Sequence, residues 1–198
     1  MRKIKRENYL DTKTQFKEAI VYLKESSLYI YSSILIFIFS AAIGFFQHES
    51  FLFIDKILEE IMQKTEGLNM YEMIFFILQN NLQSALYSII LGVFLGIFPL
   101  ISSLVNGVVI GYVLQKVYVI AGLAEWWRLL PHGIFELPAI FISFGLGIRL
   151  GFSIFSKKPK IREFKRRFYN SANTFLMIII PLLIIAAIIE GILIGLAE

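Results

Sequence analysis

Long apolar runs separated by short charged blocks dominate the hydrophobic pattern of this chain. An α-helix needs roughly 20 apolar residues to cross a hydrocarbon core of about 30 Å. Five runs approach or exceed this length, and they predict spanning helices at about residues 28–46, 82–98, 100–121, 129–155 and 175–196. The predicted fold is therefore all-α, a polytopic bundle of transmembrane helices.

The segments between these runs predict two further features. Proline is disfavoured inside a helix, so Pro99 predicts a tight turn between the second and third spans. After the first span, apolar residues recur at helical spacing opposite acidic ones, which predicts an amphipathic helix on the membrane surface. The apolar members are Phe51, Ile54, Ile57, Leu58 and Ile61, and the acidic members are Asp55, Glu59 and Glu60. The predicted organisation is a basic amino-terminal segment, 1–27, and one transmembrane domain, 28–198.

The distribution of basic residues predicts the orientation of the chain. Seven Lys and Arg residues precede the first span, and eight lie from the end of the fourth span, at Arg149, to the start of the fifth, whereas four fall in the remaining segments. Loops rich in Lys and Arg stay on the cytoplasmic side. We therefore expect a multi-pass protein of the cell (plasma) membrane, with a cytoplasmic amino terminus and an extracytoplasmic carboxyl terminus.

Composition narrows the possible functions. The chain is 57% hydrophobic, has a mean hydropathy of +0.71, and contains no cysteine, which excludes disulfides, thiolate metal sites and thiol catalysis. The net charge of +4 comes from residues that flank apolar runs. This placement favours the lipid bilayer as partner, with anionic headgroups at the basic loop 157–167, and argues against nucleic acid. The amino terminus is too basic and its first apolar run too long for a cleavable signal peptide.

Several amide and ionisable residues interrupt the apolar runs, where each is costly and needs an explanation. We expect most of them to face one another inside the bundle. The predicted polar cluster consists of Asn80, Asn81, Asn106, His132, Glu136 and Glu190.

His132 and Glu136 form the most specific pair in this cluster. A spacing of four places both side chains on one helix face, where they can hydrogen-bond or share a proton. Pro131 suits a first helical turn, but Pro138 removes a backbone hydrogen bond. The fourth span is therefore predicted to be kinked or broken near its outer end, as membrane helices often are at ion or substrate sites.

Glycines in the spans predict close packing of helix backbones. Four Gly-xxx-Gly pairs occur, and such pairs serve contacts within one chain or in a homodimer. The glycines expected to pack are Gly92, Gly96, Gly107, Gly111, Gly133, Gly147, Gly151, Gly191 and Gly195.

Three interpretations of the polar cluster remain open at this stage. An intramembrane hydrolase would need a metal or a nucleophile, yet His48 and His132 do not form a familiar two-histidine zinc pattern. A proton or ion relay would use the same cluster as its pathway. Alternatively, the polar side chains tie helices together by buried hydrogen bonds. No catalytic residue, metal or cofactor is predicted.

Several of these motifs resemble the stage II sporulation protein M family. The resemblance rests on Asn80-Asn81, on Asn106-Gly107, and on the run Leu130-Pro-His-Gly-Ile-Phe-Glu-Leu-Pro-Ala139, followed by glycines up to Gly151. It implies a multi-span membrane protein without established chemistry. The resemblance also implies a role, because the family member in spore formers acts as a membrane scaffold that recruits cell-wall hydrolases during engulfment. We therefore expect a membrane scaffold or assembly protein that is not an enzyme, with an ion or small-solute channel or transporter as the alternative.

Overall fold

The structure of the protein is a computed structural model. In it, the described residues form a bundle of long helices. The structure describes residues 11–123, 126 and 130–195, and the side chains of all of these except 130–132, 194 and 195. Its elements are α1 (Thr12–Phe46), η2 (His48–Phe51), α2 (Ile54–Thr65), α3 (Met70–Leu91), α4 (Ile97–Ala121), α5 (Leu130–Gly151), η4 (Phe152–Phe155), α6 (Lys160–Thr174), η5 (Phe175–Ile179) and α7 (Ile180–Gly195). Within these described residues, five helices are long and apolar enough to cross a membrane, so the predicted fold class is confirmed.

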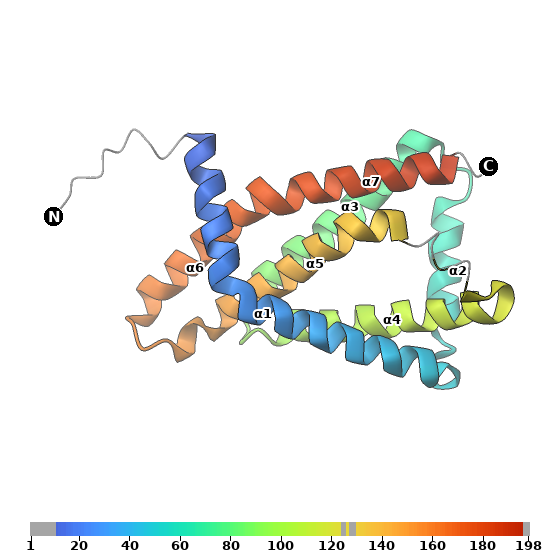
Figure 1. The fold of residues 1–198 in the computed structure, drawn as a ribbon, viewed down its shortest axis with the longest axis horizontal. Coiled ribbons are helices and arrows are strands. Elements are labelled where there is room, and N and C mark those ends of the chain that lie inside the picture. Colours follow the sequence, from blue (N-terminus) through green and yellow to red (C-terminus); the bar gives the residue numbers. More distant parts are fainter. Residues whose placement is uncertain (1–10, 124–125, 127–129, 196–198) are drawn as a thin grey trace.

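The fourth span occupies the centre of the bundle. Within its most apolar window 67% of residues are buried, against 22–33% in the other four spans. Figure 1 shows α5 between the α1–α4 pair and the α3–α7 pair, and α5 packs against all four of these helices. Ala139, Phe144, Leu146 and Leu150 of α5 have no exposed surface.

Glycine lets the backbones of α5 and its neighbours meet directly. A methyl group at Gly92 would collide with the backbone of Gly147, and one at Gly151 would collide with the backbone at Gly92 and Gly96. Likewise, a methyl group at Gly107 would strike α1 at Phe37 and Ser40, and one at Gly111 would strike Ala41. Gly133 differs, because its nearest neighbour outside the helix backbone is Leu137 of its own helix, at 3.6 Å.

The turn between α3 and α4 lies earlier than Pro99 predicted. It runs from Gly92 to Gly96, where Leu95 (φ 58°) and Gly96 (φ 72°) have left-handed backbone angles. Gly96 adopts such angles without steric cost, because it lacks a Cβ atom. Pro99 instead lies buried in the first turn of α4, a position that proline tolerates because its missing N–H would have no helical partner there.

The fourth span was predicted to be kinked or broken near Pro138, and the predicted break is wrong. α5 is helical from Leu130 to Gly151, and Pro138 is exposed on its surface. Membrane helices tolerate proline where neighbouring groups satisfy the freed backbone carbonyl. The helix therefore passes the proline without interruption.

Two helices are longer than a bilayer requires. α1 begins at Thr12 rather than at Leu28, and its 35 residues span about 52 Å. The second is formed by α6 and α7, which continue into each other through the single π-helical turn Phe175–Ile179. Figure 1 shows α6 and the first part of α1 together at one end of the bundle, called here the α6 end.

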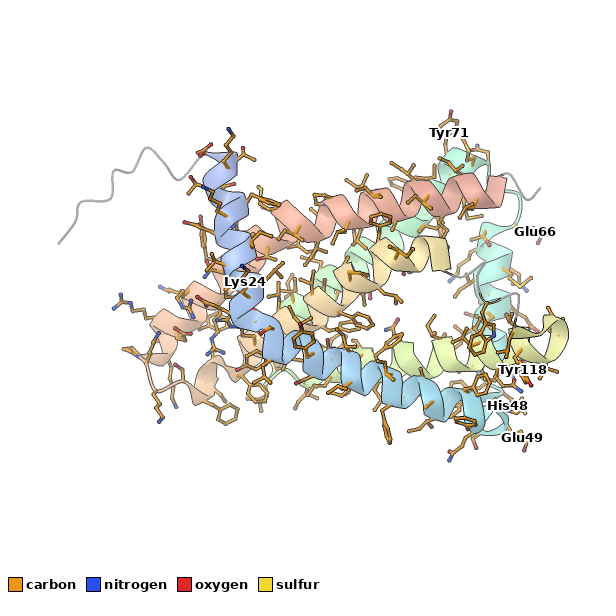
Figure 2. All side chains as sticks on the ribbon, in the orientation of Figure 1. Lys24, His48, Glu49, Glu66, Tyr71 and Tyr118 are labelled. Atoms are coloured by element: carbon orange, nitrogen blue, oxygen red, sulfur yellow. The ribbon has the colours of Figure 1, made fainter. Side chains whose placement is uncertain are left out.

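The amphipathic helix α2 lies at the opposite end, called here the α2 end. Ile54 is buried against Val108 and Tyr112 of α4, while Ile57 and Ile61 are exposed. Figure 1 shows α2 running across the ends of the spanning helices, as expected for an interfacial helix. Figure 2 places Lys24 toward the α6 end and His48, Glu49, Glu66 and Tyr71 at the α2 end.

The close approach at Gly147 predicts a sharp difference between two glycines of one helix. Gly147→Ala should lower the free energy of unfolding by about 1–3 kcal/mol, because the added methyl group overpacks the contact with α3. Gly133→Ala, the matched control, should cause no loss, since alanine favours helix and finds space there. Equilibrium unfolding in detergent micelles measures both values, and equal losses would contradict the packing described here.

Candidate functional site

Four residues of the predicted polar cluster line one recess at the α2 end. Asn80 and Asn81 come from α3, Glu136 from α5 and Glu190 from α7. The recess has a volume of about 430 Å³, and Ile61 and Thr65 of α2 complete its wall. Three spanning helices and the amphipathic helix therefore bring these polar side chains together.

The polar groups of this recess differ in their partners. The Asn81 side chain is only 9% exposed and forms no hydrogen bond with the described residues. Glu190 is half-buried and also has no hydrogen-bond donor among the described residues. Glu136, in contrast, does interact with another residue. Asn81 and Glu190 therefore present hydrogen-bonding capacity to the recess itself.

Two other members of the predicted cluster do not line the recess. Asn106 is exposed on the outer surface of α4, where its amide donates to the Ser102 carbonyl at 2.8 Å. The side chains of His132 and Pro131 lie outside the described residues, so the predicted pairing of His132 with Glu136 stays a prediction. His48 lies 3.4 Å from the Gln115 amide, at the end of α4 rather than at the recess.

The middle of α5 separates the recess from the opposite end of the bundle. Ile140, Ser143 and Phe144 are buried there, and the Ser143 hydroxyl donates to the Ala139 carbonyl of its own helix at 2.8 Å. Ser33 of α1 donates to the Phe141 carbonyl at 3.3 Å. These hydroxyls are satisfied by backbone, so this layer is packed and apolar.

A second polar group, centred on Arg149 of α5, lies at the α6 end. Arg149 is only 6% exposed, and its guanidinium donates to the Glu25 carboxylate at 2.7 Å and to the Ser26 hydroxyl at 2.6 Å. The same guanidinium lies 4.2 Å from the centroid of the Tyr22 ring. These contacts fasten α5 to α1 by charge-assisted hydrogen bonds and a cation–π contact.

Glu163 extends this group to α6. It is 5% exposed and accepts hydrogen bonds from Arg166 at 2.8 Å and Arg167 at 2.9 Å. Arg167 also donates to the Arg149 carbonyl, and Arg166 donates to Glu25 at 3.2 Å. We call these five residues, Glu25, Arg149, Glu163, Arg166 and Arg167, the α6-end ion network. It locks three helices, α1, α5 and α6, to one another.

The sequence interpretation missed this network, because it counted Arg149, Arg166 and Arg167 only as charges that set topology. One signal was available. Arg149 lies between Gly147 and Gly151 in an apolar run, and a charge placed among packing glycines is expected to face protein rather than lipid.

The described residues offer little for metal chemistry. They contain no group of three or more His, Asp or Glu side chains placed to hold a metal ion.

An ion pair connects α2 to α4. Asp55 of α2 is paired with Lys116 of α4, and the hydrogen bond from Lys116 lowers the pKa of the Asp55 carboxyl below its usual value. This pair anchors α2 on the bundle.

The buried position of Glu163 predicts a large effect of neutralising it. Glu163→Gln should lower the free energy of unfolding by about 3–5 kcal/mol, because it leaves the largely buried Arg167 without its opposite charge. The exposed Glu60→Gln is the matched control and should change stability little. Detergent-micelle unfolding would contradict the network's role if both substitutions had the same small effect.

The family comparison agrees with this architecture. The family model described as Stage II sporulation protein M matches residues 33–193, which include the carboxyl-terminal part of the first span, the other four spans and both polar groups apart from Tyr22, Glu25 and Ser26. Searches of curated proteins and of solved structures gave no significant match. The match covers most of the chain and confirms the resemblance seen in its motifs: this integral, multi-pass membrane protein belongs to the stage II sporulation protein M family.

Proposed function

We propose that this chain is a membrane scaffold or assembly protein of the stage II sporulation protein M type, without chemistry of its own. The observation that carries the proposal is the buried middle of α5, where Phe144 and Leu146 have no exposed surface. A conducting pathway needs a polar or hydrated route across the membrane, whereas a scaffold needs only rigid surfaces. The packed centre supports the second role.

The two ends of the bundle give this scaffold its surfaces. The first part of α1 and the basic helix α6 lie together at the α6 end, which supports a cytoplasmic position for that end in the plasma membrane. The carboxyl-terminal end of α7 would then lie outside. Lys158 and Arg162 line an open hollow beside α6 that suits anionic lipid headgroups or a soluble protein partner.

Asn106 supports a homodimer as part of the same proposal. It projects from the outward face of α4, and its amide oxygen accepts no hydrogen bond from the described residues. An amide facing lipid gains a partner when two spans meet, because asparagine both donates and accepts. The second copy of this chain is the simplest such partner.

A channel or transporter is the second candidate, and the recess at the α2 end favours it. A cavity lined by Asn80, Asn81, Glu136 and Glu190 is what a pathway would need at one membrane face. The recess accounts for one end of such a pathway, and the buried layer around Phe144 opposes its continuation.

Ion flux separates the two functions. Liposomes carrying the purified protein should show no more flux of Na⁺, K⁺ or H⁺ than empty liposomes, because the middle of α5 is packed. Glu136→Gln should leave this low flux unchanged. Robust flux that Glu136→Gln or His132→Ala abolishes would overturn the scaffold proposal and establish the second candidate. Zinc that co-purifies in stoichiometric amount would instead point to a hydrolase.

A further inference from the structure

The recess at the α2 end has features that a scaffold does not use. Its volume of about 430 Å³ lies in the range of pockets that take small organic molecules. Asn81, whose side chain is largely buried, and the half-buried Glu190 both line it, and neither forms a hydrogen bond with the described residues. Their polar atoms therefore face the open space of the recess, where a molecule that enters it can supply their hydrogen bonds.

The polar side chains of the recess favour a ligand that is positively charged and donates hydrogen bonds. A carboxylate only accepts hydrogen bonds, and an amide accepts as well as donates. Glu190 contributes a carboxyl group without a donor among the described residues, and Asn80 and Asn81 contribute amide oxygens, whereas Glu136 already interacts with another residue. A protonated amine offers three donors and complements this surplus of acceptors.

The lining of the recess is also partly apolar, which favours more than a bare ion. Its apolar members are Met73, Phe76 and Ile77 of α3 and Ile61 of α2. The described residues provide only two carboxylates here and no cluster of three metal-ligating side chains. The volume and the apolar part of the lining therefore favour an ammonium group carried on an alkyl or aryl body over a metal ion.

A hollow with acidic side chains adjoins this recess. A neighbouring hollow of about 580 Å³ shares Thr65 and Met73 with it and is lined by Glu59 and Glu66. Figure 2 shows Glu66 at the α2 end of the molecule. Negative side chains around a cleft raise the local concentration of cations.

We infer that this recess binds a ligand with a primary ammonium group on an apolar body, held by Asn81 and Glu190. The ligand is either a soluble amine or the headgroup of an aminolipid such as phosphatidylethanolamine, since both present the same group. The inference does not depend on the proposed function. A scaffold is expected to conduct no ions whether or not it has this binding site, so the flux experiment and the binding experiment can fail separately.

Binding of 2-phenylethylammonium to the full chain tests this site. In phosphatidylcholine nanodiscs, isothermal titration should show saturable binding, and the neutral isostere 2-phenylethanol should bind at least tenfold more weakly. Glu190→Gln and Asn81→Leu should each weaken binding of the amine at least tenfold. The matched control Glu60→Gln lies outside both hollows and should leave the affinity unchanged.

The composition of the nanodisc distinguishes the two sources of the amine. If phosphatidylethanolamine fills the recess, replacing phosphatidylcholine by it should weaken 2-phenylethylammonium binding by competition. If the ligand is a soluble amine, the affinity should be equal in both lipids. Absence of saturable binding in phosphatidylcholine, or equal binding of 2-phenylethanol by the unchanged protein, would overturn the inference. So would unchanged amine affinity in Glu190→Gln and Asn81→Leu proteins that keep their helical circular dichroism.

Discussion

Contact between helix backbones at the glycines of α5 is the constraint on which the rest of this structure depends. Lipid tails are as apolar as leucine, so hydrophobic burial alone gives little force for assembling helices in a bilayer. Close approach at Gly147 and Gly151 replaces that force by dense van der Waals contact with α3 and with the turn at Gly96. Once α5 is fixed in this way, the helices around it have fixed positions as well.

The central position of α5 divides the polar chemistry of the protein between two ends. At the α6 end, Arg149 and Glu163 are buried, paired and fully used in holding α1, α5 and α6 together. At the α2 end, Asn81 and Glu190 face a cavity and have no described partner. Satisfied polar groups stabilise a structure, whereas unsatisfied ones are a common mark of a binding site. The first group therefore holds the bundle, and the second is available to a ligand.

The sequence predicted the five spans because run length decides whether a helix can cross a bilayer, but it began the second span at residue 82, whereas α3 begins at Met70. It misplaced the turn before α4, since Pro99 was a visible signal while the left-handed angles at Gly96 were not. It grouped Asn106 with the cluster because α4 is apolar on all sides, so no pattern indicated which face is inside. Asn80, Asn81, Glu136 and Glu190 do share one recess, although only their rarity in apolar runs predicted it.

The α6-end ion network could not be predicted by counting charges. The positive-inside rule uses the number of Lys and Arg residues in a loop and ignores which of them are buried. Glu25 is far in sequence from Arg149 and Arg166, and only the crossing of α1, α5 and α6 brings both guanidinium groups within hydrogen-bond distance of its carboxylate.

Single-cysteine accessibility tests most directly whether the middle of α5 is sealed, and the chain has no native cysteine to interfere. Asn80→Cys lines the recess at the α2 end, whereas Ser143→Cys replaces a hydroxyl with no exposed surface by a thiol of similar size. With a water-soluble, membrane-impermeant maleimide applied to both faces of the bilayer, the account predicts labelling of Asn80→Cys and none of Ser143→Cys. Labelling of Ser143→Cys at a comparable rate would show water in the centre of the bundle and contradict a sealed scaffold.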